Sequence, residues 1–494
     1  MFLPFFMRVK HLLALSLGLT PVAATAAVRV PALVGDHMVL QRDQPLAIWG
    51  WAEPGEKITV DFRQQKVSVV TPANGRWQAT LPATSSGGPF VMTIAGSNTL
   101  TINDILVGDV WLASGQSNME LPLRDPNAPK PGAYPLIKNA EQEVAQANFP
   151  QIRQFTVKKQ PAAQPQATME GYNWRVCTPE TAAGFSAVAY FFARDLHQRY
   201  RVPIGIISSP WGGTPAEAWV GGSTLLQQPD FREKVAALQA TPAPALPEKD
   251  PQNTPSALFN GMIAPLIPYT LKGIIWYQGE SNVGRAAQYR TLFPALIQDW
   301  RQRWGQQLPF LFVQLANWQP AHAQPTDSDW ARLREAQTAA LALPRTGMAV
   351  AIDLGDAADI HPANKQDVGH RLALVARSVA YGDKQVVAKG PALKKMSVQG
   401  SAVRLEFEPA GAGLQLRGES GAAAKPGGVR GFAVAGADKL FYWAEGKLQG
   451  NTLVLNSPQV AAPVAVRYDW ADNPNGNLYN REGLPAAPFR TDTW

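Results

Sequence analysis

Cysteine is almost absent from this chain: Cys177 is the only one in 494 residues. An internal disulfide needs two cysteines, so the fold depends on packing alone. Charged residues make up only 17% of the sequence, and no long run of Lys or Arg accompanies the formal net charge of +7. A weak and diffuse positive charge does not predict nucleic-acid binding, and we expect no nucleic-acid partner.

Histidine is also scarce. The chain has six, at His11, His37, His197, His322, His361 and His370. No two of them have the spacing of a metal-ligand motif with acidic partners. We therefore expect no metal site, and metal-dependent hydrolysis has no support in the sequence.

Long apolar runs are missing except near the N-terminus. There Arg8 and Lys10 precede the run Leu12–Leu19, and small residues follow at Ala23–Ala27. The run is shorter than the roughly 20 residues that span a membrane. A basic stretch, a short apolar run and a small-residue cleavage site predict a secretory signal peptide over residues 1–26. Its removal would give a periplasmic or secreted protein with no membrane anchor.

Both ends of the remaining chain look β-rich. Over residues 27–103, runs such as Leu46–Trp51, Ile58–Phe62 and Phe90–Ile94 are separated by Pro and Gly turns. Over residues 384–494, Val403, Leu405 and Phe407 alternate with charged residues, which is typical of a strand with one solvated face. Whether the two regions form one domain is left open by the sequence.

The middle, residues 104–383, predicts an α/β domain. Helical patterns such as Phe185–Tyr200 separate five apolar β-type runs: Ile105–Ala113, Ile204–Ser208, Gly273–Trp276, Phe310–Leu315 and Met348–Leu354. Alternating strands and helices predict a mostly parallel, five-stranded sheet that helices cover on both faces. Residues about 221–255, a polar helix followed by a Pro-rich stretch, interrupt this rhythm as an insertion.

Candidate chemical groups follow four of these runs. The segments are Gly115–Met119, Trp211–Thr214, Tyr277–Asn282 and Gly355–Pro362. Because ligands bind beyond the carboxyl ends of strands in an open α/β sheet, we expect these segments to meet at one edge.

The four segments contain the parts of an acyl-transfer site. Ser117 needs a base to remove its proton, and His361 can serve if it is neutral. A carboxylate can fix the His361 tautomer; Asp359 is the first candidate, Asp356 the next, and Asp353 lies just upstream. A backbone carbonyl that orients His361 is the alternative.

An oxyanion would form on the substrate and would need donors. The candidates are the backbone N–H of Ser117, the N–H of Gly213 or Gly212, and the side-chain amide of Gln278. No cofactor is needed for this chemistry.

These segments closely resemble the conserved blocks of the SGNH hydrolase superfamily and, within it, the sialate O-acetylesterase-like family of carbohydrate esterases. The resemblance runs from about residue 28 to residue 494. It implies a flavodoxin-like α/β/α core, Ser117 as nucleophile, His361 as base, and an oxyanion hole that uses Gly213 and Gln278. Many SGNH enzymes place the aspartate three residues before the histidine, where this chain has Ala358.

Several further residues are candidates for substrate contact. Aromatic faces stack on sugar rings, so we expect Trp211 and one of Trp318 or Trp330 to touch substrate. Asn118 and Glu280 could contact the substrate or only brace the loops. Arg334 could meet a substrate carboxylate, such as that of sialic acid, or form an internal ion pair, and of the two we expect the ion pair.

The sequence therefore predicts an exported serine esterase that removes O-acetyl groups from a carbohydrate through an acetyl-Ser117 intermediate. The family resemblance suggests sialic acid or a plant-wall polysaccharide such as xylan or xyloglucan, and the sequence does not choose between them. A lipase or thioesterase on the same core and a non-catalytic glycan-binding protein are the alternatives. The oligomeric state is not indicated.

Overall fold

The computed structural model describes residues 1, 27–125, 137–240, 244–408, 411–418 and 428–494. The predicted signal peptide lies, apart from Met1, outside the described residues. Among the described helices, none is both long enough and apolar enough to cross a bilayer.

The centre of the molecule is a mixed α/β domain with a large sheet. Six strands pair in parallel, in the order β13-β12-β11-β7-β10-β8, and β9 adds antiparallel to β8. Their bounds are β7 Thr99–Gly115, β8 Phe149–Thr156, β9 Arg175–Cys177, β10 Ile204–Pro210, β11 Gly273–Tyr277, β12 Phe310–Gln314 and β13 Thr346–Val350. All five predicted runs are strands, although β13 ends four residues before the predicted Leu354.

The predicted count of five parallel strands is wrong because β8 was missed. This strand contains a proline and the polar residues Arg153 and Gln154, so it lacks an apolar run. Arg153 is buried, and its guanidinium donates to the carbonyl of His37 and to the Asp104 carboxylate. The lone Cys177 is buried at the end of β9, where burial raises the pKa of its thiol to about 12.

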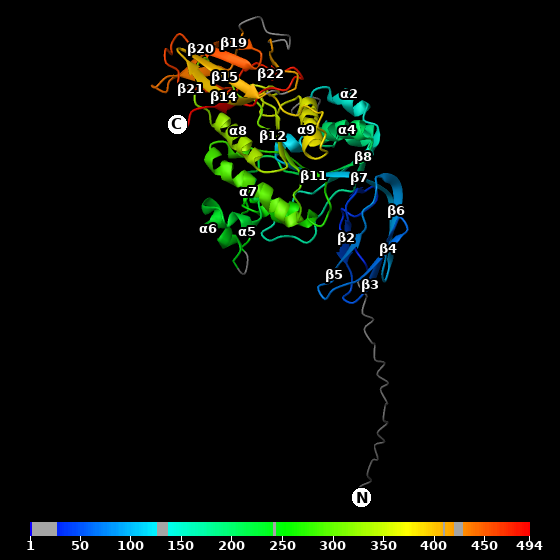
Figure 1. Cartoon of the computed structure of the whole chain (residues 1–494). Coiled ribbons are helices and arrows are strands. Elements are labelled where there is room, and N and C mark those ends of the chain that lie inside the picture. The colour runs from blue at the N-terminus through cyan, green and yellow to red at the C-terminus, as the bar shows by residue number, and fades with distance from the viewer. Residues whose placement is uncertain (2–26, 126–136, 241–243, 409–410, 419–427) are drawn as a thin grey trace.

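Helices cover both faces of this sheet (Figure 1). Helix α4 (Ala187–Tyr200) packs against α9 (Lys365–Val379) on one side, and α7 (Ala286–Trp304) packs against α8 (Asp329–Ala339) on the other. The shorter helices are α1 Ser117–Glu120, α2 Ala140–Ala145, α3 Pro179–Ala182, η1 Ala216–Trp219, η3 Phe259–Ile263, η4 Ala264–Leu266, η5 Glu280–Asn282 and η6 Ala340–Ala342.

The predicted insertion contains α5 (Gly222–Leu225), α6 (Pro229–Leu238) and the 3-10 turn η2 (Pro251–Asn253). Residues 241–243 of the Pro-rich stretch are outside the described part of the chain. Helix α6 accounts for the predicted polar helix.

The strands of the N-terminal region are β1 Val39–Gln41, β2 Leu46–Trp51, β3 Lys57–Phe62, β4 Gln65–Val70, β5 Arg76–Leu81 and β6 Gly87–Ala95. Strands β1, β3, β4 and β6 are continuous with the central sheet, whereas β2 and β5 pair with each other in a separate two-stranded sheet. The first half of β7 pairs with β6 and β1, and the second half pairs with β10 and β11. One hydrophobic core consequently extends from Val28 to Ala376.

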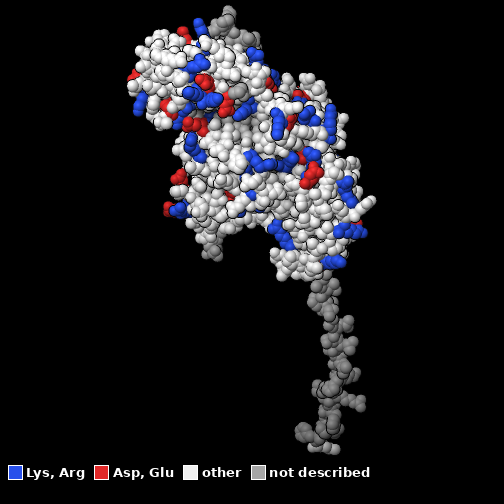
Figure 2. All heavy atoms as spheres, viewed as in Figure 1, with Lys and Arg blue, Asp and Glu red and all other residues white. Residues whose placement is uncertain are grey.

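The C-terminal region has a hydrophobic core of its own, from Val403 to Ala486. Its strands are β14 Ala392–Gln399, β15 Ala402–Glu408, β16 Leu414–Leu416, β17 Phe432–Ala435, β18 Phe441–Trp443, β19 Glu445–Gln449, β20 Thr452–Asn456, β21 Ala465–Tyr468, β22 Leu478–Asn480 and β23 Phe489–Arg490. The predicted alternation along β15 is confirmed, because Val403, Leu405 and Phe407 are buried. Figure 1 shows the N- and C-terminal regions at opposite ends of the molecule. Figure 2 shows basic and acidic side chains interspersed over the C-terminal region on this face.

A buried arginine joins the C-terminal region to the central domain. Arg334 on α8 is fully buried and donates four hydrogen bonds of 2.7–3.0 Å, to the carbonyls of Leu315, Ala316, Ala471 and Asp472. The predicted ion pair of Arg334 is absent from the described structure, and burial lowers its pKa to about 9. Backbone carbonyls from both regions thus meet on one guanidinium.

We predict that Arg334→Met destabilises the protein by about 3 kcal/mol, because it leaves four carbonyls without their donor. Thermal unfolding followed by circular dichroism measures the effect. Arg332→Met on the same helix is the matched control: Arg332 is exposed and pairs with Asp327 and Asp329, so its removal should change little. Equal effects of the two changes would contradict this account.

Candidate active site

Ser117 lies at the carboxyl end of β7, where the chain turns sharply into α1. Gly115 has φ of +133°, and a Cβ there would lie 2.2 Å from the carbonyl oxygen of Tyr277. Only glycine fits such a close approach of two neighbouring strand ends. The turn leaves Ser117 half-buried, as the first residue of α1.

His361 comes to Ser117 from the loop that follows β13. Its Nε2 lies 3.0 Å from Ser117 Oγ, and its Nδ1 lies 3.0 Å from Asp359 Oδ1. Because a carboxylate only accepts, Nδ1 carries the proton and Nε2 is free to accept from the Ser117 hydroxyl. Asp359 Oδ1 also accepts from the backbone N–H of His361 at 2.9 Å, which fixes the loop.

The other two candidate carboxylates face elsewhere. Asp353 forms a two-pronged ion pair with Arg371 and accepts from the Tyr479 hydroxyl. Asp356 accepts from the backbone N–H of Ala358 and is exposed. Of the three, Asp359 is the one that contacts His361.

Burial of His361 lowers its pKa below the ordinary value of 6.5, and the charge of Lys365 lowers it further. The hydrogen bond and charge of Asp359 raise the pKa, in opposition, but burial is the larger effect. The imidazole is therefore neutral at pH 7, as a proton acceptor has to be.

The predicted oxyanion donors are not equivalent. The N–H of Gly212 donates to Glu120 Oε2 at 2.6 Å, so this donor is occupied. Gly212 lies against Ser117, since a Cβ at this glycine would be 3.2 Å from the Ser117 Cβ. Within the described ranges, the backbone N–H groups of Ser117 and Gly213 have no hydrogen-bond partner. They are the donors that remain available.

The prediction that Gln278 donates to an oxyanion does not fit this structure. Gln278 is fully buried, and its Nε2 donates to the carbonyl of Thr214 at 3.2 Å and to Asn282 Oδ1 at 2.7 Å. Its Oε1 accepts from the Tyr289 hydroxyl. Both amide protons are therefore used to brace the loops that follow β10 and β11.

Asn118 and Glu280 belong to a buried polar cluster beside Ser117. Asn118 Nδ2 donates to Glu280 Oε1 at 2.6 Å and to the carbonyl of Ile360 at 3.2 Å. Asn118 Oδ1 accepts from the ammonium of Lys365. Because Asn118 is only 1% exposed, its predicted contact with substrate does not fit, and it connects the serine loop to the histidine loop instead.

Lys365 is the member of this cluster that sequence reasoning missed. It is fully buried at the start of α9, and burial lowers its pKa to about 7. Burial also raises the pKa of Glu280, partly offset by the hydrogen bond from Asn118 and the charge of Lys365. A lysine four residues after His361 looks like an ordinary helix start, so the sequence carries no signal for its burial.

Two further residues were also missed. Gln116 Oε1 accepts from the backbone N–H groups of Gly279 and Ser281, each at 3.3 Å. Glu120 binds the Gly212 amide and the Lys159 ammonium. Gln116 directly precedes Ser117 and Glu120 follows it by three residues, and that proximity is the only signal the sequence offers.

The candidate tryptophans differ in exposure. Trp330 is 4% exposed and donates its Nε1–H to the carbonyl of Ala316, so its predicted contact with substrate does not fit. Trp318 is half-buried, packs on Trp330, and forms a β-bridge with Asp356. Trp211 is also half-buried, with the Lys159 ammonium 5.4 Å from its ring centroid. Of the three candidate tryptophans, Trp211 and Trp318 are thus the ones that keep part of their surface exposed.

Across the described ranges, no group of three or more His, Cys, Asp or Glu side chains is placed to hold a metal ion. The described site is thus a Ser117–His361–Asp359 chain of contacts with two backbone donors beside it. This arrangement can activate a hydroxyl nucleophile and stabilise an oxyanion.

Comparison with known protein families identifies the class. Residues 107–377 match the family model "Carbohydrate esterase, sialic acid-specific acetylesterase". The chain belongs to this family and is an ester hydrolase.

Individual relatives agree with this assignment. The chain is 35% identical over 409 residues to the human sialate O-acetylesterase, covering 75% of this chain and 74% of the relative. The mouse sialate O-acetylesterase is 34% identical over 430 residues, covering 76% and 77%. Among solved structures, a carbohydrate acetylesterase from Xanthomonas citri is 44% identical with a TM-score of 0.84, covering 95% of this chain and all of that one.

The electrostatics predict opposite shifts of the His361 pKa in two variants. Asp359→Asn removes the group that raises this pKa, so the pKa should fall further. Lys365→Met removes a positive charge that lowers it, so the pKa should rise. The sign holds because Lys365, with a pKa of about 7, is charged where His361 titrates.

Proton NMR titration of the histidine ring resonances measures both shifts. His370 is an internal control, because it pairs with Asp195 at 2.5 Å and has no contact with either changed residue. Shifts of the same sign in both variants, or an equal movement of His370, would refute the assigned causes.

Proposed function

We propose that this protein removes O-acetyl groups from a carbohydrate, with Ser117 as nucleophile, His361 as general base and Asp359 as the group that orients the imidazole. The observation that carries the proposal is the 3.0 Å contact of His361 Nε2 with Ser117 Oγ, continued by the 3.0 Å contact of Nδ1 with Asp359. Membership in a family of carbohydrate esterases supports the reaction class.

The reaction has two steps. His361 accepts the hydroxyl proton as Ser117 Oγ attacks the acetyl carbonyl, and then passes that proton to the departing sugar alcohol. Water next attacks the acetyl-Ser117 ester, with His361 again as base, and releases acetate. Asp359 stabilises the imidazolium that forms in both steps.

The backbone N–H groups of Ser117 and Gly213 stabilise the oxyanion in this proposal. They are fixed before substrate binds, so no reorganisation is needed as charge develops. The Asn118–Glu280–Lys365 cluster holds the serine loop and the histidine loop together. No cofactor takes part in this mechanism.

For the substrate, we propose a class of acetylated sugar rather than one compound. Curated relatives carry the name sialate O-acetylesterase, and the structural relative carries the name carbohydrate acetylesterase. An O-acetylated sialic acid and an acetylated plant-wall polysaccharide both fit these names. Trp211 and Trp318, the half-buried tryptophans near the site, are the side chains that we propose to contact the sugar.

Export to the periplasm or secretion is part of the same proposal. Its support is the basic, apolar and small-residue pattern over residues 1–26. An exported enzyme would meet glycans outside the cytoplasm.

A lipase or thioesterase is the alternative on the same core. Such an enzyme needs an apolar channel that ends at the nucleophile. An apolar cavity of about 560 Å³ lies between β13, α9 and the C-terminal region, lined by Leu341, Val375 and Val379 among others. Neither Ser117 nor His361 lines it, so this cavity does not favour long acyl chains as substrate.

We predict that Ser117→Ala lowers the release of acetate from 4-nitrophenyl acetate and from acetylated glycans by at least about a thousand-fold. Purified wild type and variant would be compared on both substrates, with 4-nitrophenyl octanoate to test the lipase alternative. Ser281→Ala is the matched control, because this serine lies in the neighbouring short helix η5 and, among the described residues, only its backbone forms hydrogen bonds. Retained activity in Ser117→Ala, or faster octanoate hydrolysis, would reject the proposal.

A second prediction concerns pH. Because the His361 pKa lies below 6.5, kcat/KM should fall on acidification with its midpoint below pH 6.5, as the imidazole becomes protonated. The pH profile of kcat/KM on 4-nitrophenyl acetate measures this, and circular dichroism at each pH excludes unfolding. A rate that stays constant down to the pH of unfolding would contradict the role of His361.

A further inference from the structure

Two tryptophans differ from the other described tryptophans in being exposed. Trp443 on β18 is 39% exposed and Trp494 is 43% exposed, and their neighbour Leu440 is 56% exposed. All three line one cavity of about 350 Å³ at the edge of the C-terminal region. Exposed apolar surface gathered in one place marks a binding site more often than scattered exposure does.

The wall of this cavity combines aromatic rings with polar groups. Phe441 and Trp470 complete the aromatic part, and Thr326 and Asp327 supply a hydroxyl and a carboxylate from the loop before α8. A cavity of about 300 Å³ or more with a few polar groups is of the kind that holds a small ligand. A pyranose ring, with an apolar face and a rim of hydroxyls, matches a wall that is aromatic and polar at once.

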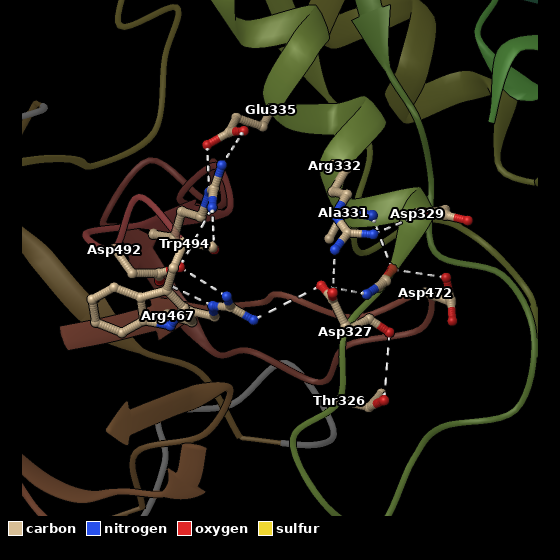
Figure 3. A network of polar contacts seen from close by, with 12 residues as sticks. Thr326, Asp327, Asp329, Ala331, Arg332, Glu335, Arg467, Asp472, Asp492 and Trp494 are labelled. Atoms are coloured by element: carbon tan, nitrogen blue, oxygen red, sulfur yellow. Dashed lines mark hydrogen bonds and ion pairs between the residues drawn. The ribbon is translucent and has the colours of Figure 1, made fainter. Parts of the chain in front are cut away.

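Some of the positively charged side chains at the cavity are already paired with carboxylates. Arg467 lies 2.8 Å from Asp492, and Arg332 contacts Asp327 and Asp329 (Figure 3). These guanidiniums are thus already neutralised by carboxylates.

Lys439 differs from both arginines. Within the described ranges it forms no ion pair, and its Nζ lies 5.2 Å from the centroid of the Trp494 ring. It adopts a φ of +65° in the turn between β17 and β18, a conformation that non-glycine residues seldom take. The turn therefore presents an unpaired ammonium beside an exposed aromatic face.

The loop between β12 and α8 connects this cavity to the active site. Near its start, Trp318 forms a β-bridge with Asp356 in the histidine loop. Further along, the carbonyl of Ala323 accepts from Trp443 Nε1 at 2.8 Å, and Thr326 and Asp327 reach the cavity. One loop therefore contacts both the histidine loop and the cavity.

We propose that this cavity is a second sugar-binding site, separate from the catalytic site, which takes a pyranose that carries a carboxylate. The ring stacks on Trp443 or Trp494, and Lys439 pairs with the carboxylate. The inference rests on the proposed function only in taking the ligand to be part of the glycan whose acetyl groups are removed. A sialic acid and a uronic acid share the required chemistry.

Isothermal titration calorimetry on the Ser117→Ala protein tests the site without turnover. The probes are sialyllactose and a glucuronic-acid-substituted xylo-oligosaccharide, with lactose and xylotetraose as their neutral counterparts. We expect at least one acidic probe to bind at least about five-fold more tightly than its neutral counterpart. Preference for sialyllactose would identify the ligand as a sialic acid, and preference for the substituted xylo-oligosaccharide would identify it as a uronic acid. Equal affinity for acidic and neutral probes would overturn the proposal.

Variants then locate the binding. Adding Trp443→Ala should weaken acidic binding about ten-fold or more, Trp443→Phe should retain most of it, and Lys439→Gln should abolish the preference for the acidic probe. Tyr172→Ala, which removes an aromatic residue of 53% exposure outside the cavity, should have no effect. Unchanged binding in Trp443→Ala, or equal losses in Trp443→Phe and Trp443→Ala, would overturn the proposal.

Because the probes carry no O-acetyl ester, these results do not depend on catalysis. Binding without acetate release by the wild-type protein would refute the esterase mechanism and leave the sugar site standing. Acetate release without binding at the cavity would refute the second sugar site and leave the esterase mechanism standing.

Discussion

The continuity of β7 is the constraint on which the arrangement of the central domain depends. One strand pairs with β1 and β6 along its first half and with β10 and β11 along its second half, and it ends at the turn that carries Ser117. Gly115 permits that end because the carbonyl of Tyr277 occupies the space of a side chain. Strands β1 and β6 and the turn that carries Ser117 are therefore positioned by the same strand.

The polar cluster of Asn118, Glu280 and Lys365 adds a second constraint. Its members come from the loops after β7, β11 and β13, so three strand ends meet on hydrogen bonds rather than on apolar contacts alone. A buried ammonium and a buried carboxylate are unfavourable apart, and shared contact with one amide makes them tolerable. This explains why residues that look like substrate ligands in the sequence lie behind the serine instead.

The sequence predicted those parts that depend on burial or on position along the chain. The strands β7, β10, β11 and β12 were predictable because strands buried on both faces form continuous apolar runs. The edge strand β13 alternates between buried and half-buried residues, and its predicted apolar run overlapped it only in part. Ser117, His361 and Asp359 were candidates because they follow strand ends. Strand β8 was missed because Arg153 and Gln154 are buried with polar partners. The contacts of Gln278, Lys365 and Arg334 were missed because they join segments that meet only in three dimensions.

The four carbonyls that accept hydrogen bonds from Arg334 determine whether the central and C-terminal regions can be separated. Two come from the segment after β12 and two from the segment after β21, so the guanidinium is satisfied only when both parts are present. Cutting the chain after the central domain would expose a cation that had been coordinated on both sides. The C-terminal region, despite its own core, is consequently not an independent module, because α8 and the segment after β21 are joined through one buried cation.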